Sequence, residues 1–398
     1  MLDKTVTKLR IVNVVACLIG FSQALATYLN SSFLKEKTGS DNVGLFYVLA
    51  YLLVLAGLLN FHKLIRKIGK AQTLWLVAIG EVVALGLLLA FMGSWFSLIG
   101  LILYLLFDAL IGVSMDIVLE SLSDEKNIGR IRGSYLTLWN IGFIFGPKIS
   151  SLLMDASGKY GYYAVFGLIF ILKAFVLYIL IRYLGKVKNG KLPQQEKVFE
   201  LFHKFWHHRN LRRIYYVSFV LEFFYGLMIV YTPIYLRELG FSWVEVGSIF
   251  FIMLLPFLFF EYPIGWLADK KWGEREMAFF FLTWLGFFTA ILYFFEVKNF
   301  WLWTIGLLIT RIGAASVQIL RDSYFYKRIA EGDFDLIDVF RTAQPVGYIM
   351  AALVSGFLLQ WVDLKTLFLV NAIVVFSALF PTYFLLDNLS EEEKMRRV

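Results

Sequence analysis

Long apolar runs alternate with short polar and basic connections along the whole chain. Each run has about 20 mostly apolar residues, the length that an α-helix needs to cross a lipid bilayer. The runs are too long for membrane-spanning strands and do not alternate with period two. They cover residues 10–34, 43–62, 72–93, 97–121, 133–154, 161–184, 213–236, 244–267, 276–295, 300–322, 336–360 and 364–386. The pattern predicts an all-α membrane protein with twelve transmembrane helices.

The longest connection divides the predicted helices into two groups of six. It covers residues 185–212, so the sequence predicts an N-terminal six-helix bundle at 1–184 and a C-terminal six-helix bundle at 213–398. From Phe199 to Arg213 the connection mixes aromatic and basic residues. This mixture is typical of an amphipathic helix lying on the anionic inner leaflet of a membrane.

The two halves share a weak internal repeat. Residues 112–121 align with residues 314–323, at an offset of 202 residues, about half the chain. Repeated halves related by an axis along the membrane normal occur among polytopic membrane proteins. The repeat therefore indicates two pseudo-symmetric bundles.

Composition supports a membrane protein and argues against other classes. Hydrophobic residues make up 59% of the chain, against roughly 45–50% in soluble domains. Charged residues make up 17%, and the mean hydropathy is +0.70. A net charge of +8 would suggest nucleic acid in a soluble protein, but these basic residues lie between apolar runs, so we expect no nucleic acid. The chain has a single cysteine, Cys17, so no internal disulfide can form. His203 and His207 have no clear third ligand, so we predict no metal and no cofactor.

The distribution of Lys and Arg predicts the topology. With the N-terminus inside, 28 of these residues lie on the inner side, six on the outer side and four within spans. Such an excess is typical of cytoplasmic connections. We therefore expect a prokaryotic plasma (inner) membrane protein, a monomer, with both termini in the cytoplasm.

The connection between the eighth and ninth spans carries small and charged residues in a distinctive order. They are Gly265, Asp269, Lys270, Gly273 and Arg275. This order resembles the signature loop of the major facilitator superfamily, with one residue inserted before the second glycine. The resemblance implies that Asp269 approaches Arg130 and Arg132, at the start of the fifth span, and helps to close the cytoplasmic side. The first-half connection keeps Gly69 but lacks the acidic residue.

The fifth span carries Gly133, Gly142, Gly146 and Pro147. Their spacing resembles a motif shared by many exporters of the same superfamily. Small residues four apart let two helix backbones approach closely, and we expect Gly142 and Gly146 to face the eighth span. The resemblance implies a fold of two six-helix bundles that rock around a central site, lined by the first, fourth, seventh and tenth spans.

Ionisable and polar residues inside the spans are the candidates for function, because a charge at the bilayer centre costs roughly 2.5–3.5 kcal/mol. A carboxylate in low dielectric takes up protons readily, which suits proton coupling. For Glu120 and Asp322, near the cytoplasmic ends, an interfacial position is the simpler interpretation. The predicted substrate and proton-coupling residues are Gln23, Asp108, Asp116, Glu222, Arg311 and Gln318.

Two buried ion pairs are predicted from depth in the membrane. Glu81 and Lys173 lie at equal depth on the third and sixth spans and are expected to form a structural pair. Lys148 and Asp108 differ in depth by about one turn and are expected to pair beside the cavity.

The leading functional prediction is secondary active transport of a small molecule by alternating access, as proton-coupled efflux. One alternative is proton-coupled uptake of a sugar, organic acid or peptide, in which Arg311 would bind an anionic group. Another is a non-transporting scaffold or receptor with the same fold. No Gly-x-Ser-x-Gly, His-Glu-x-x-His or P-loop pattern is present, so we do not expect an enzyme.

Overall fold

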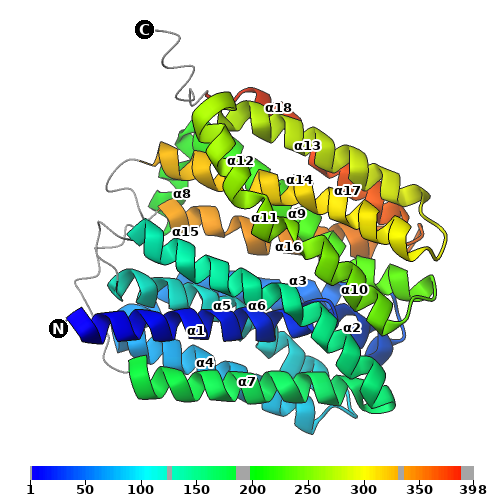
Figure 1. Ribbon diagram of the computed structural model, residues 1–398, viewed down its shortest axis with the longest axis horizontal. Coiled ribbons are helices and arrows are strands. Elements are labelled where there is room, and N and C mark those ends of the chain that lie inside the picture. The colour runs from blue at the N-terminus through cyan, green and yellow to red at the C-terminus, as the bar shows by residue number, and fades with distance from the viewer. Residues whose placement is uncertain (1, 123–127, 185–197, 330–335, 387–398) are drawn as a thin grey trace. The chain divides into compact units, whose positions relative to one another are not determined.

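A computed structural model describes residues 2–122, 128–184, 198–329 and 336–386 (Figure 1). Every regular element in these ranges is a helix. The all-α prediction is therefore confirmed for the part of the chain that the structure describes.

The chain divides into two compact units. The first contains the helices up to residue 184 together with Ser242–Phe251, and the second contains the remaining helices. The predicted linker falls partly outside the described residues, so the division at 185–212 stays a prediction. Helices of the first unit are α1 (Leu2–Thr27), α2 (Asn30–Thr38), α3 (Gly44–Ile68), α4 (Lys70–Ala90), α5 (Phe96–Leu122), α6 (Ile128–Ser157), η1 (Gly158–Tyr160) and α7 (Gly161–Leu184).

The second unit has more interrupted helices. They are α8 (Val198–His207), α9 (Arg209–Glu238), α11 (Pro256–Phe259), α12 (Glu261–Leu267), the π-helical turn η2 (Ala268–Trp272), α13 (Glu274–Ile291), η3 (Leu292–Phe294), α14 (Phe300–Arg328), α15 (Leu336–Arg341), α16 (Ala343–Leu358), α17 (Thr366–Ser377) and α18 (Leu379–Tyr383). Helix α10 (Trp243–Leu254) belongs to the first unit up to Phe251. Breaks beside Pro256 and Pro381 follow from the missing N–H of proline.

By length and composition, ten helical stretches in the described residues can cross a membrane. One of them, Gly133–Leu184, is 52 residues long and contains most of α6 and all of α7. The eleventh predicted span corresponds to α16, whose 16 residues fall short of a full crossing. These two cases account for the difference from the twelve predicted spans.

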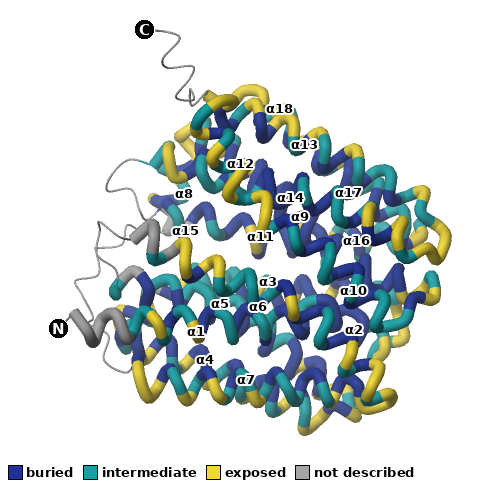
Figure 2. Tube along the Cα trace, viewed as in Figure 1, coloured by how far each residue is buried: buried dark blue, intermediate teal, exposed yellow. Residues whose placement is uncertain are grey.

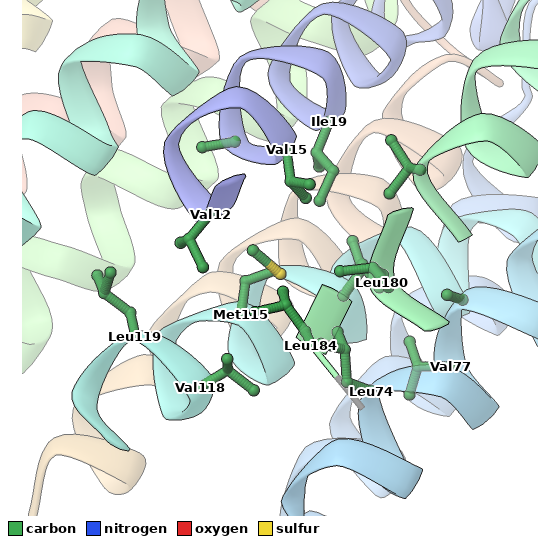
Figure 3. Close-up of a cluster of buried hydrophobic side chains, with 14 of the residues drawn as sticks. Val12, Val15, Ile19, Leu74, Val77, Met115, Val118, Leu119, Leu180 and Leu184 are labelled. Atoms are coloured by element: carbon green, nitrogen blue, oxygen red, sulfur yellow. The ribbon is translucent and has the colours of Figure 1, made fainter. Parts of the chain in front are cut away.

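The core of the first unit is built mainly from α1, α4, α5 and α7, and α3 and α6 add Phe61, Ile65 and Tyr135 to it (Figure 3). Val12, Val15 and Ile19 of α1 recur at helical spacing and point toward α4, α5 and α7. Their partners are Leu74 and Val77 of α4, Met115, Val118 and Leu119 of α5, and Leu180 and Leu184 of α7. Because these side chains fill one cluster, the polar residues on the same helices are held at fixed positions.

Helix α9 is the most buried membrane-spanning helix of the second unit (Figure 2). Its apolar window is 89% buried, against 33–56% in the other candidate spans. A helix buried all round can carry polar side chains only where partners meet them. The polar residues of α9 are therefore informative about the interior of this unit.

The predicted amphipathic helix is present as α8, but part of its apolar side packs on protein. Phe205 is 0% exposed and its ring contacts Tyr215 of α9 and Phe325 of α14. Trp206 and His207 lie on the exposed side. Helix α8 therefore packs on the second unit and ends at His207, and residues 209–213 of the predicted amphipathic stretch begin α9 instead. Its predicted position on the inner leaflet stays a prediction.

The glycines of the fifth span face α1, which corrects the expectation that they face the eighth span. A Cβ atom added to Gly142 would lie 2.1 Å from the Cys17 carbonyl oxygen, and one added to Gly146 would lie 2.3 Å from the Ala24 Cβ. The eighth span approaches α6 through its own glycine instead, since a Cβ on Gly247 would lie 2.0 Å from the Ser151 hydroxyl. The small residues of α6 thus serve two different helix contacts.

We predict that Gly142→Ala and Gly146→Ala each destabilise the protein by about 1–3 kcal/mol, because an added methyl group overpacks the α1–α6 contact. Thermal unfolding of the purified protein in nanodiscs measures this change. Gly133→Ala is the matched control, since an added Cβ meets nothing within 4 Å there and alanine favours a helix. Equal midpoints for all three variants would contradict the close α1–α6 approach.

Candidate functional site

Four helices of the first unit bring charged and polar side chains together in its interior. Lys173 Nζ of α7 lies 2.5 Å from Glu81 Oε1 of α4 and 3.1 Å from Asp108 Oδ1 of α5. Gln23 Nε2 of α1 donates a hydrogen bond of 2.8 Å to Asp108 Oδ2. We call these four residues the carboxylate–lysine cluster.

The carboxylate–lysine cluster is buried and unequal in charge. Relative exposures are 1% for Glu81, 8% for Asp108 and 1% for Lys173. Two carboxylates therefore share one ammonium group in a region with almost no access to water. If all three groups were ionised, the cluster would carry one net negative charge, which a low-dielectric interior disfavours strongly.

The pairing of Glu81 with Lys173 was predicted and is confirmed. The predicted pairing of Asp108 with Lys148 is wrong. Lys148 Nζ donates instead to the hydroxyl of Ser248 on α10, at 2.6 Å. Asp108 faces the α1 and α7 side of α5, so both of its oxygens are already occupied by Gln23 and Lys173.

The second unit contains a buried ion pair between α9 and α14. Arg321 Nη2 lies 2.9 Å from Glu222 Oε1, and Nη1 donates to the Ser218 hydroxyl at 2.8 Å. Arg321 Nε also lies 3.3 Å from Asp322 Oδ1. The predicted candidate Glu222 is therefore neutralised by an arginine that the sequence analysis did not assign to it.

Arg311 occupies a different environment on the same helix. Its side chain is 1% exposed, and its guanidinium carbon lies 5.3 Å from the Phe224 ring centroid and 5.4 Å from that of Tyr225. The hydroxyl of Tyr225 donates to Gln318 Oε1 at 3.0 Å. The predicted residues Arg311 and Gln318 thus meet through one aromatic residue of α9.

Asp116 lies two turns beyond Asp108 on α5 and is only partly buried. Its predicted role stays a prediction, and the side chain of Glu120 lies outside the described residues. Within the described ranges, no group of three or more His, Cys, Asp or Glu side chains could hold a metal ion.

The signature-like loop is organised by Lys327 of α14. Its ammonium group pairs with Asp269 Oδ1 at 2.5 Å and with Glu274. Glu274 is only 1% exposed. Residues 268–272 form a π-helical turn, which accommodates the one-residue insertion before Gly273. Gly273 has φ +74°, a value that favours glycine.

The other loop candidates surround this centre. Gly265 lies on α12, Lys270 on the π-helical turn, and Arg275 is a half-buried residue that donates to Glu276 at 2.8 Å. The side chains of Arg130 and Arg132 lie outside the described residues. The predicted contact of Asp269 with them therefore stays a prediction.

The internal repeat is visible in matching local geometry. Gly69 has φ +92° and ψ 161°, and Gly273 has φ +74° and ψ 158°. The residue after each glycine bonds a serine of the repeat: Lys70 Nζ donates to Ser121 at 2.8 Å, and Ser323 donates to Glu274 at 3.0 Å. The two halves therefore share the same local geometry here, but the residue after the glycine is basic in the first half (Lys70) and acidic in the second (Glu274).

Sequence comparison agrees with this geometry. The sequence profile of the Major Facilitator Superfamily matches residues 12–333 and 245–396. The chain belongs to the Major Facilitator Superfamily. Its members are transporters, so this protein is an integral membrane transporter by family and not an enzyme. No curated protein sequence matches the chain significantly.

Solved structures of the superfamily share the fold of this protein. A mutant of the nucleoside transporter NupG superposes with a TM-score of 0.76 at 12% identity, over 95% of this chain and 99% of that one. An auto-inhibited POT family peptide transporter gives a TM-score of 0.78 at 12% identity, over 96% and 98%. At this identity the likeness shows the major facilitator fold alone.

We predict that Lys173→Met destabilises this facilitator by about 3–5 kcal/mol, because it leaves two buried carboxylates without their counter-ion. Adding Glu81→Gln and Asp108→Asn removes the stranded charges and restores most of the stability. Chemical unfolding of the purified protein measures both changes. Lys365→Met, which removes the partner of the exposed Glu296, is the control and changes little. A triple variant no more stable than the single one would contradict the charge argument.

Proposed function

We propose that this major facilitator protein is a proton-coupled secondary transporter of a small molecule. The observation that carries the proposal is the unequal charge of the carboxylate–lysine cluster, in which Glu81 and Asp108 share Lys173. One bound proton makes the cluster neutral, and its loss leaves a buried negative charge. A group poised between these two states is suited to proton exchange.

The connection to transport runs through Asp108. This carboxylate contacts Gln23 of α1 and Lys173 of α7, so a proton arriving on it weakens its hold on both helices. The family resemblance places the first and fourth spans, here α1 and α5, beside the central cavity. Protonation at Asp108 is therefore proposed to bias the position of α1, as a ligand biases a two-state equilibrium.

A scaffold or receptor with the same fold is less well supported. Buried ion pairs contribute little net stability, and apolar residues of similar volume often replace them without loss. A protein that only needed the fold would gain nothing by keeping Glu81, Asp108 and Lys173. The cluster is better explained by a function that uses its charge.

The direction of transport is proposed from the sequence. The Gly142, Gly146 and Pro147 spacing resembles that of exporters, which favours proton-coupled efflux. Proton-coupled uptake of an organic acid or peptide is the second candidate, because Arg311 is a buried cation without an ionic partner among the described residues. We propose a prokaryotic plasma membrane with both termini in the cytoplasm, supported by the excess of inner basic residues.

Flux into proteoliposomes tests the proposed coupling. We expect the transport of one of four solute classes (nucleosides, short peptides, monocarboxylates or sugars) to be accompanied by proton movement across the membrane. A pH-sensitive dye inside the liposomes detects this movement under an imposed pH gradient. Asp108→Asn and Glu81→Gln should reduce gradient-driven accumulation to the level of protein-free liposomes while exchange of labelled solute survives. The sign of the dye response separates antiport from symport.

The matched control for this experiment is Glu296→Gln. It removes an exposed carboxylate that also pairs with a lysine, Lys365, and should leave coupled flux unchanged. Uphill accumulation that persists in both Asp108→Asn and Glu81→Gln would refute the proton assignment.

A further inference from the structure

We propose that Arg311 binds the carboxylate of a monoanionic substrate, in a subsite completed by Phe224, Tyr225 and Gln318. The proposal rests on the proposed transport function and names its substrate class. Arg311 lies near the middle of α14, a helix of 29 residues, and therefore close to the bilayer centre. Intramembrane arginines at this depth normally pair with an acid or mark a substrate pathway.

The aromatic rings hold the guanidinium group without satisfying its hydrogen bonds. Phe224 is 0% and Tyr225 8% exposed, and both ring centroids lie within 5.4 Å of the Arg311 guanidinium carbon. Ring faces stabilise a cation by electrostatic attraction. They accept no conventional hydrogen bond, so the N–H groups of Arg311 still need acceptors.

The unsatisfied atoms define a binding edge. Among the described residues, Arg311 Nε and Nη2 are buried with no hydrogen-bond partner. These two nitrogens lie side by side on one edge of the guanidinium plane and direct their N–H bonds in parallel. The two oxygens of a carboxylate match this edge through a bidentate pair of charge-assisted hydrogen bonds.

Arg321, ten residues further along α14, shows what a structural arginine looks like in the same helix. It is buried, yet it is paired with Glu222 and bonded to Ser218. Glu222 is thereby occupied and does not supply an acid to Arg311. The contrast between the two arginines indicates that the acceptor for Arg311 comes from a ligand.

The charge balance favours a monoanion. One guanidinium group neutralises one negative charge. A phosphate dianion would leave its second charge uncompensated in a buried site, whereas a monocarboxylate leaves the subsite neutral. Tyr225 fixes Gln318 through its hydroxyl and positions it as a second polar contact. The subsite is closed in this structure, so α9 or α14 has to move before a substrate enters.

Ligand-dependent thermal unfolding of the full-length protein in nanodiscs tests the subsite. The probes are acetate to octanoate, benzoate, phenylacetate and alanyl peptides, each compared with its primary amide, together with inorganic phosphate. We expect at least one carboxylate to raise the unfolding midpoint while its amide and phosphate do not. This comparison isolates the oxyanion, because acid and amide share the same skeleton.

Substitutions locate the effect at Arg311. Arg311→Lys keeps the charge but loses the bidentate edge and should weaken carboxylate binding about 10-fold, and Arg311→Gln about 100-fold. If Arg311→Gln does not fold, Arg311→Lys alone still decides. Arg182→Gln is the matched control, because it removes an exposed arginine that lies over a tyrosine ring, Tyr183, and should bind as the wild type does.

Several results would overturn the proposal. They are equal stabilisation by acids and amides, stabilisation by phosphate alone, no stabilisation by any probe, and full carboxylate affinity in Arg311→Lys. Binding is measured without a pH gradient, so it is independent of proton coupling. A protein that binds carboxylates but moves no protons would refute the proposed coupling and leave this subsite standing.

Discussion

A charge inside a lipid-embedded helix bundle has no water to stabilise it, and this constraint organises the interior of the protein. An ionised side chain there persists only when a partner on another helix meets it. The structure contains three solutions. Arg321 is buried against Glu222 and also meets Asp322, whose side chain is 38% exposed, so only one of its two acids is buried. The carboxylate–lysine cluster buries one acid in excess, and Arg311 has aromatic rings but no acid among the described residues. The two unbalanced sites are those to which we assign function.

Because α1 packs closely against α6, a change in the carboxylate–lysine cluster can affect the position of more than one helix. On one side α1 touches the backbone of α6, where Gly20 meets Trp139 and Gly142 meets Cys17. On another side Gln23 of α1 holds Asp108. Because backbones this close leave little freedom to slide, α1 and α6 are expected to move together. A proton that changes the Gln23–Asp108 contact would then act on two helices at once.

Sequence patterns were sufficient for features that depend on composition and period. The apolar runs predicted the helices, and the loop around Asp269 led to the family. Depth in the membrane predicted the Glu81–Lys173 pair. The same depth argument could have paired Asp108 with Lys173. Asp108 lies twelve residues after Phe96, where α5 begins, and Lys173 lies twelve residues after Gly161, where α7 begins. Asp108 was nevertheless assigned to Lys148.

Other features depend on which side of a helix faces which neighbour, and one sequence does not contain this information. The glycines of α6 were correctly expected to make a close contact, but their partner proved to be α1. The Glu222–Arg321 pair was missed because the predicted span 300–322 placed Arg321 at its very end, whereas α14 continues to Arg328 and holds Arg321 two turns inside the helix. The aromatic rings beside Arg311 belong to Phe224 and Tyr225 of α9. The position of Arg311 within α14 does not predict that these residues of another helix lie next to it.

The central claim is that the carboxylate–lysine cluster holds a proton. Infrared spectroscopy of the purified protein at neutral pH tests it directly, because a protonated carboxyl group has a C=O stretching band distinct from that of a carboxylate. The account predicts such a band in the wild-type protein and its loss or shift in both Glu81→Gln and Asp108→Asn. A wild-type spectrum whose protonated-carboxyl region is unchanged in both variants would show that the two acids are ionised together, and would contradict the account.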